Sequence, residues 1–262
     1  MNMPSDTSAP PRIALVTGAG SGIGKACAQA LLHEGWTVVH AGRTQATLEA
    51  AIAAADATQP GCGERAWAHA VDVCDETSVH ALFDAIRARH GRLDLLFNNA
   101  GIFPPGNTPD LLDGAAWRRS VDTNLNGAFY CLSAAFALMR SQSPQGGRII
   151  NNGSISAHAP RPNSIAYTTT KHAITGLTKA ASLDGRPFDI AVGQIDIGNV
   201  ASEMTERMAA GILQADGSIR PEARMDMSAV TETFMAMARL PLSANVLFTT
   251  VMATRMPFVG RG

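Results

Sequence analysis

The chain has 262 residues, a length that suits one large α/β domain with a sizeable core. Its formal net charge is −1 and it has no basic block, which argues against nucleic acid or an anionic membrane surface as a partner. No apolar run approaches the roughly 18 residues that a membrane-spanning helix needs, so we expect no membrane partner.

The N-terminus and the metal-binding residue types suggest a cytoplasmic protein without a metal. Residues 1–11 are rich in Ser, Pro and Thr and lack the apolar core of a signal peptide, so we expect a disordered leader before a single domain over 12–262. The 4 cysteines form no Cys-x-x-Cys pair, and the 7 histidines show no ligand spacing. Free thiols in a reducing cytoplasm and no metal site are therefore expected.

Short apolar runs alternate with helical patterns along the chain. The first run, residues 12–17, lacks period-2 alternation, as is typical of a strand buried on both faces. Further strands are predicted at 37–41, 65–73, 93–97, 148–151, 188–195 and 245–252, with helical patterns between them. This order predicts an α/β fold, a Rossmann-like doubly wound parallel sheet of about seven strands with helices on both faces.

A glycine-rich turn follows the first predicted strand. Gly18, Gly22 and Gly24 separate that strand from the helical pattern that begins at Ala26. Glycine lets the backbone approach a pyrophosphate closely, and a helix N-terminus supplies free N–H groups. The spacing is not the general Gly-x-Gly-x-x-Gly fingerprint, and alone such a cluster could be only a mobile loop. The flanking strand and helix favour dinucleotide binding.

The end of the second strand bears on the choice of cofactor. A domain that prefers NAD places a carboxylate about 20 residues beyond the glycine turn to bind the ribose hydroxyls. No Asp or Glu lies between Glu34 and Glu49, and the position offers Gly42 and Arg43 instead. A cation suits a 2′-phosphate, so NADP is favoured and NAD stays possible. The alternative is that Arg43 is merely a solvent-facing turn residue.

Two further polar residues each allow two interpretations. Asp72, at the end of the third strand, could accept a hydrogen bond from an adenine amino group, or could cap the helix that starts near Asp75. Asn124 interrupts an apolar helical pattern over 115–139 and needs hydrogen-bond partners if it is buried. A neighbouring carbonyl alone could satisfy it.

Tyr167 and Lys171 are four residues apart in a helical pattern, so they share one helix face. A phenol has an unperturbed pKa of about 10. An ammonium one turn away is expected to lower that pKa and make the phenol a usable acid/base group. Ser154 follows the fifth strand, at the sheet edge where open α/β sheets bind ligands. Alone, the pair could be a surface tyrosine beside a solvated lysine.

These residues together resemble the short-chain dehydrogenase/reductases of the short, single-domain type, over nearly the whole chain. The resemblance is carried by five signatures in the right order and spacing. They are Thr17-Gly18-x-x-x-Gly22-x-Gly24, Asn98-Asn99-Ala100-Gly101, Asn124, Ser154 and Tyr167-x-x-x-Lys171.

The resemblance implies hydride exchange between NAD or NADP and a small-molecule carbonyl or secondary alcohol, in a homo-oligomer (tetramer or dimer). It makes Tyr167 the acid/base group, Lys171 the partner of the nicotinamide ribose, Ser154 a donor to the substrate oxygen, and Asn124 the holder of a relay water beside Lys171. The cofactor contacts that it implies are Gly18, Ser21, Gly22, Ile23, Gly24, Arg43, Asp72, Val73, Asn98, Ala100, Gly101, Tyr167, Lys171, Ile197, Gly198, Val200 and Ser202.

The segment after the sixth strand departs from the family pattern. Ile197-Gly198 stands where the family usually has Pro-Gly, and Ser202 stands where it has a Thr. Without the proline, the loop and the lid expected within 202–240 should be less rigid. That lid is helical in pattern, is broken at 215–221 and is rich in methionine. The predicted pocket, from 102–107, 158–163 and 202–239, is expected to be apolar or weakly polar, which suits an uncharged, largely apolar ligand.

Two other functions remain open. A non-catalytic NADP-binding redox sensor or scaffold could use the same fold. The presence of Asn124, Ser154, Tyr167 and Lys171 argues against it. An epimerase or dehydratase of the related longer scaffold is disfavoured by the length of the chain.

Overall fold

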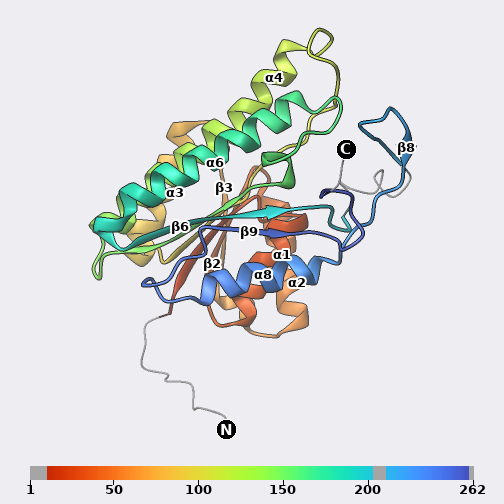
Figure 1. Cartoon of the computed structure of the whole chain (residues 1–262). Helices are drawn as coiled ribbons and strands as arrows, with labels where there is room; N and C mark the ends of the chain where they lie inside the picture. Colours follow the sequence, from red (N-terminus) through yellow and green to blue (C-terminus); the bar gives the residue numbers. More distant parts are fainter. Residues whose placement is uncertain (1–10, 203–210, 260–262) are drawn as a thin grey trace.

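The computed structural model describes residues 11–202 and 211–259. Seven parallel strands form the central sheet in the order β3-β2-β1-β4-β5-β6-β9. Helices α3, α4 and α6 lie above the sheet in Figure 1, and α1, α2 and α8 lie below it. The predicted doubly wound α/β fold is confirmed.

The described chain alternates between strands and helices throughout. The strands of the main sheet are β1 Ile13–Thr17, β2 Thr37–Gly42, β3 Ala66–Ala70, β4 Leu95–Asn98, β5 Gly147–Asn152, β6 Ile190–Ile197 and β9 Phe248–Val251. The α-helices are α1 Gly22–His33, α2 Gln45–Thr58, α3 Glu76–His90, α4 Gly114–Val121, α5 Gly127–Ser141, α6 Ile165–Gly185 and α8 Met227–Arg239. Short helical turns occur at η1 Cys62–Arg65, η2 Asp122–Asn126, η3 Ile155–Ala157 and η4 Arg186–Phe188.

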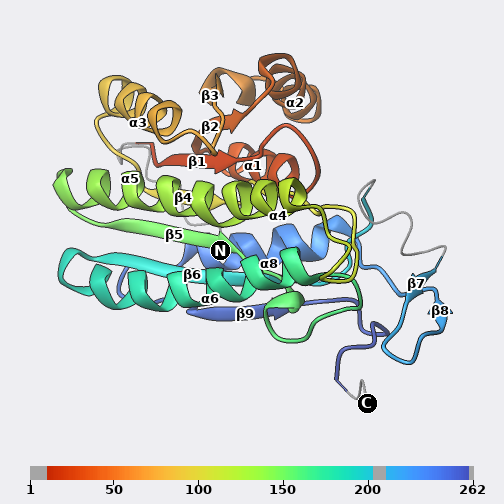
Figure 2. The ribbon, with the colours of Figure 1, turned by 90° about the horizontal axis from the view of Figure 1, so that it is seen from above.

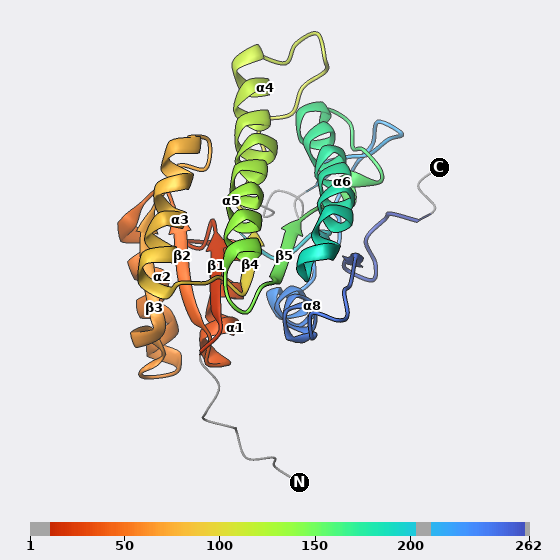
Figure 3. The ribbon, with the colours of Figure 1, turned by 90° about the vertical axis from the view of Figure 1, so that its left-hand side faces the viewer.

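Strand β1 shows why its sequence lacks alternation between apolar and polar residues. Ala14 and Val16 pack into the core beneath the sheet with α1 and α8, whereas Ile13 and Leu15 pack into the core on the other face with α3 and α5. All four side chains are at most 4% exposed. Both faces of the sheet are thus covered, as parallel strands require. Figures 2 and 3 show α5 and α6 side by side on one of these faces.

Polar side chains and glycine define the ends of several helices. The Asp75 carboxylate accepts a hydrogen bond from Thr77 N at 3.0 Å and caps α3, which ends at Gly91 in the left-handed conformation. The Asp113 carboxylate caps α4 in the same way through Ala116 N, at 3.1 Å.

The long helix expected over 115–139 is continuous but contains one wide turn. At η2 the N–H of Gly127 bonds to the carbonyl of Asp122, five residues earlier, so this turn is of the π type. Such turns are rare within helices and occur often at functional sites. Asn124 lies in this turn.

The helical pattern predicted over 202–238, with a break at 215–221, is wrong at 211–214 and at 222–226, where the structure has no helix. Strands β7 (Ile212–Leu213) and β8 (Ile219–Arg220) form an antiparallel hairpin there. At its tip Asp216 accepts hydrogen bonds from the Ser218 backbone and hydroxyl, and Gly217 has a φ of +81°. Asp and Gly favour such a turn over a helix. In Figure 2 the hairpin lies at the end of the molecule toward which β5 and β9 point.

Parts of two predictions fall on residues outside the description. Residues 1–10 of the predicted leader and residues 203–210 of the predicted lid lie outside the described residues.

In residues 11–202 and 211–259, no helix is long and apolar enough to cross a membrane. Within that part of the chain, no three His, Cys, Asp or Glu side chains gather where they could hold a metal ion.

Candidate active site

A cavity of about 700 Å³ lies at the carboxyl ends of β1 to β6. Open α/β sheets bind ligands at this edge. Of the predicted site residues, all line the cavity except Asn98 and Asn124, which are buried behind its wall. The residues that line it are Gly18, Ser21, Gly22, Ile23, Gly24, Arg43, Asp72, Val73, Ala100, Gly101, Ser154, Tyr167, Lys171, Ile197, Gly198, Val200 and Ser202.

The glycine turn between β1 and α1 depends on the absence of side chains. Gly18 and Gly22 have φ values of +68° and +52°, which side chains rarely permit. A Cβ at Gly24 would stand 2.2 Å from the carbonyl oxygen of Gly18. Ser21 occupies the N-cap of α1 in an extended conformation, without a capping bond from its side chain. The N-terminus of α1 therefore faces the cavity, and its free backbone N–H groups could bind a phosphate group there.

The residues after β4 hold this turn in place. The Thr17 hydroxyl accepts hydrogen bonds from the backbone N–H groups of Asn99 and Ala100, both at 2.9 Å. The Asn99 amide donates to the Thr17 carbonyl, also at 2.9 Å. Asn98 instead donates to the carbonyl of Ala128, at 2.7 Å, in the core. The side chain of Asn98 thus does not reach the cavity, and Asn99 takes the place that was predicted for it.

Two polar residues lie at the opposite end of the cavity from β5. Arg43 is exposed directly after β2. Asp72 is also exposed, and its carboxylate accepts a hydrogen bond from Cys74 N at 3.0 Å. Since Asp75 caps α3, the interpretation of Asp72 as that cap is wrong.

Tyr167 and Lys171 enter the cavity from α6. The Tyr167 ring packs edge-on against Phe103, with 4.7 Å between ring centres. The Lys171 side chain is buried and donates a hydrogen bond from Nζ to the carbonyl of Asn152, at 2.7 Å. This bond anchors the lysine at the end of β5.

Ser154 is held at the same place by backbone and side-chain contacts. Its N–H donates to the Asp196 carboxylate at 2.9 Å, and its hydroxyl accepts from Ser156 N at 3.1 Å. The hydroxyl also lies within hydrogen-bonding reach of the Tyr167 phenol. Ser154, Tyr167 and Lys171 thus converge at one end of the cavity.

Burial has the largest effect on the pKa values of Tyr167 and Lys171. It raises the pKa of Tyr167, an effect that the Ser154 hydrogen bond and the charge of Arg161 oppose in part and the charge of Asp196 adds to. Burial also lowers the pKa of Lys171 to about 8, and the charge of Asp196 offsets part of that change. Without a bound cofactor, the predicted lowering of the pKa of Tyr167 is therefore wrong. Desolvation outweighs the Ser154 hydrogen bond and the charge of Arg161.

Both the oxygen and the nitrogen of the Asn124 side-chain amide form hydrogen bonds with the loop after β4. Its Oδ1 accepts from Ile102 N at 2.7 Å, and its Nδ2 donates to the Ile102 carbonyl at 2.9 Å and to the Thr170 hydroxyl at 3.3 Å. The alternative of bonding to a neighbouring carbonyl is therefore what the structure shows. Among the described residues, no hydrogen bond joins this side chain to Lys171.

An ion pair beside the cavity was not predicted. The Arg161 guanidinium, which lines the cavity, donates to the Glu222 carboxylate at 2.5 Å and to Asn199 Oδ1 at 3.0 Å. Glu222 also accepts from Gln214, next to the hairpin, at 3.1 Å. The expectation that the pocket residues are apolar or weakly polar is thus wrong at Arg161. Arg161 and Glu222 are 61 residues apart, and no local pattern relates them.

The fold and the site together define a class of protein. A glycine turn at the start of a helix and a Ser–Tyr–Lys group lie in one cavity at the carboxyl edge of a doubly wound sheet. Residues 12–212 match the family model described as short chain dehydrogenase. The chain belongs to this family of oxidoreductases.

Relatives and solved structures agree with this assignment. A 3beta-hydroxysteroid dehydrogenase of Mediterraneibacter gnavus is 38% identical over 201 residues, which cover 77% of this chain and 70% of that protein. The crystal structure of levodione reductase matches with a TM-score of 0.82 and 27% identity, over 92% of this chain and 96% of that one. A metagenomic short-chain oxidoreductase in complex with NADP matches with a TM-score of 0.76 and 25% identity, over 93% and 97% of the two chains.

Proposed function

We propose that the protein is an NADP-dependent oxidoreductase that interconverts a carbonyl and a secondary alcohol. The observation that carries this proposal is the convergence of Ser154, Tyr167 and Lys171 in the cavity that also contains the glycine turn. The dehydrogenase and reductase names of the relatives support the reaction class.

Each residue of the group has a distinct role. Tyr167 exchanges a proton with the substrate oxygen, and Ser154 donates a hydrogen bond that holds this oxygen and stabilises charge developing on it. Lys171 holds the nicotinamide ribose. Asn124 fixes the loop at Ile102 and lies on the path by which protons reach Lys171 from solvent. The bound nicotinamide supplies or accepts the hydride, so the protein itself handles one proton and the orientation of the substrate.

NADP is proposed over NAD because of the residues at the end of β2. The exposed Arg43 follows this strand directly, at a point where NAD-preferring domains have a carboxylate. A guanidinium can pair with a 2′-phosphate. Similar structures contain NADP or NADH, so the choice between the two cofactors rests on Arg43.

The substrate is proposed to be a small or medium, uncharged and largely apolar molecule. Phe103 supplies an apolar wall beside Tyr167, and the charge of Arg161 is balanced by Glu222. Levodione reductase and the hydroxysteroid dehydrogenase are named for compounds of this kind. We further propose that the protein acts in the cytoplasm as a homo-oligomer.

A binding titration with NADPH and NADH, followed by a screen of carbonyls and alcohols, tests the proposal. We expect tighter binding of NADPH and turnover of at least one apolar carbonyl. Binding without turnover over a broad panel would instead support the redox sensor or scaffold. The oxidoreductase proposal fails if neither cofactor binds.

A further inference from the structure

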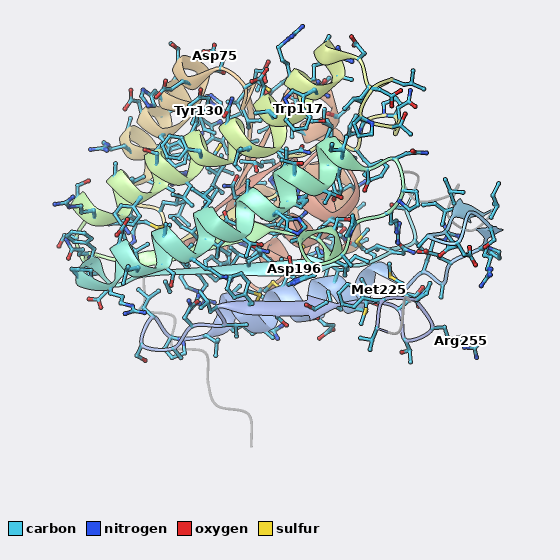
Figure 4. All side chains as sticks on the ribbon, turned by 45° about the horizontal axis from the view of Figure 1, so that its top comes forward. Asp75, Trp117, Tyr130, Asp196, Met225 and Arg255 are labelled. Atoms are coloured by element: carbon cyan, nitrogen blue, oxygen red, sulfur yellow. The ribbon has the colours of Figure 1, made fainter. Side chains whose placement is uncertain are left out.

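Asp196 is a fully buried carboxylate in β6, directly beneath the candidate active site. Its Oδ1 accepts hydrogen bonds from Ser154 N at 2.9 Å and from Gln194 Nε2 at 2.7 Å. Its Oδ2 lies 2.7 Å from Nε2 of His158, a residue whose side chain is 43% exposed. Figure 4 labels Asp196 beneath α6, in the interior of the molecule.

A chain of buried side chains ends on this carboxylate. Asn98 donates to Asn151 at 3.2 Å, Asn151 to Thr178 at 2.9 Å, Thr178 to Gln194 at 3.0 Å, and Gln194 to Asp196. In each of these hydrogen bonds the acceptor is the side chain nearer to Asp196 along the series. Such a directional chain favours a final group that only accepts hydrogen bonds, as an ionised carboxylate does.

The backbone next to Ser154 is shaped to admit the carboxylate. A Cβ at Gly153 would stand 2.0 Å from Asp196 Oδ1 and 2.7 Å from Gln194 Nε2. Only a glycine therefore allows Asp196 this close to the strand end that carries Ser154. The contact between Asp196 and the Ser154 N–H is part of how β5 and β6 pack, and it sets the position of the serine.

We infer that Asp196 is a positioning residue for the reaction, which holds the Ser154 backbone and sets the charge around Tyr167 and Lys171, with His158 as its partner at the surface. This inference rests on the proposed function, because those three residues are the ones proposed to act on the substrate. Asp196 touches neither substrate nor cofactor in this role.

The charged and titratable groups around Asp196 indicate what its charge does. His158 faces it from the segment after η3, and Tyr167 and Lys171 come from α6, with Arg161 near Tyr167. Burial has the largest effect on the pKa at both sites. The negative charge of Asp196 raises the pKa of Lys171 and, as the smallest of the effects there, that of Tyr167. Removal of that charge should lower both pKa values.

The composition of the chain allows a test that does not depend on turnover. Its 2 tyrosines are Tyr130 and Tyr167, so in a Tyr130→Phe background the ultraviolet absorbance of phenolate reports Tyr167 alone. Figure 4 labels Tyr130 on the upper helices, away from Asp196. Asp196→Asn keeps an acceptor for Ser154 but removes the charge. We expect it to lower the midpoint of the Tyr167 titration.

Two surface variants repeat the test without a change in the core. His158→Lys places a permanent cation beside Asp196 and should move the same midpoint downward. His158→Gln keeps a neutral donor and should leave the midpoint in place. If neither Asp196→Asn nor His158→Lys moves the midpoint, the inferred electrostatic role is overturned, whether or not the protein turns over any substrate.

Kinetics test the positioning of Ser154. In the pH dependence of kcat/KM, Asp196→Asn should shift the limb assigned to Tyr167 to lower pH, with little change in NADPH affinity. Asp196→Ala also removes the acceptor of the Ser154 N–H and should lower kcat about 10²-fold, because misplaced reacting groups lose that much. Equal kcat in the alanine and asparagine variants would overturn the positioning role. Absence of turnover in the unmodified protein would count against the proposed function alone.

Discussion

The Nζ atom of Lys171 lies 5.5 Å from the centre of the Tyr167 ring, one helical turn away on α6, and is anchored to the carbonyl of Asn152. The lysine therefore faces the ring rather than forming an ion pair with it. Since burial lowers the pKa of Lys171 to about 8, its ammonium persists at neutral pH but is lost at moderately alkaline pH. The stability of the fold at alkaline pH and the proposed acid/base chemistry thus involve the same buried lysine.

The first prediction concerns stability between pH 8 and 10.5. The pKa of Lys171 falls from 10.5 to about 8 on folding, so in this window the unfolded chain binds more protons and stability rises with pH. Relative to Lys171→Met, the unmodified protein should gain up to about 3 kcal/mol in the free energy of unfolding across that window. Denaturant unfolding at several pH values measures the difference.

The exposed Lys179 on the same helix provides the control. Its replacement by Met should give a stability difference that hardly changes with pH. A flat difference for Lys171→Met as well would show that the lysine is not desolvated in the folded protein.

The second prediction concerns the phenol itself. Tyr167→Phe should reduce turnover by about 10² or more and leave NADPH affinity nearly intact, because it removes the proton donor but keeps the ring against Phe103. Steady-state kinetics and a binding titration on the same preparation check both parts. Tyr130→Phe, on α5, is the matched control and should retain activity. Unchanged turnover in Tyr167→Phe would remove this residue from its proposed role.

The third prediction concerns cofactor choice. Arg43→Ala should weaken NADPH binding at least tenfold and leave NADH binding unchanged, because the 2′-phosphate is the only group that the guanidinium is proposed to recognise. Titration with both cofactors measures the ratio. Arg87→Ala, at an exposed position on α3, controls for loss of surface charge. An equal loss for NADPH and NADH would show that Arg43 does not discriminate between them.

The fold was predictable from local sequence because parallel strands buried on both faces leave unbroken apolar runs. β1 is such a run, and the turn after it has glycines where the backbone allows no side chain. The break at 215–221, which contains the turn at Asp216 and Gly217, was predicted. The pairing of β7 with β8 was not, because the flanks of this turn carry the apolar residues of a helix.

The less local features of the site could not be predicted from the sequence. His158 and Asp196 are 38 residues apart, and a carboxylate within a strand does not indicate which distant side chain it meets. The direction of the pKa shift of Tyr167 depends on burial, which is a property of the packed molecule. The spacing of Tyr167 and Lys171 predicted that the two residues share a helix face, but not whether burial or charge decides their pKa values.

The fourth prediction concerns the glycine turn. In Gly24→Ala the new methyl group would stand 2.2 Å from the Gly18 carbonyl, so the turn must open and the start of α1 must move away from β1. We expect loss of at least tenfold in NADPH affinity and a lower free energy of unfolding, since both the phosphate site and the packing depend on this approach. Gly176→Ala is the control, because nothing lies within 4 Å of its added Cβ in the interior of α6. It should stabilise the protein by about 0.5–1 kcal/mol and leave binding unchanged. NADPH affinity retained in Gly24→Ala would show that this turn does not hold the cofactor phosphates, and the proposed binding mode would have to be abandoned.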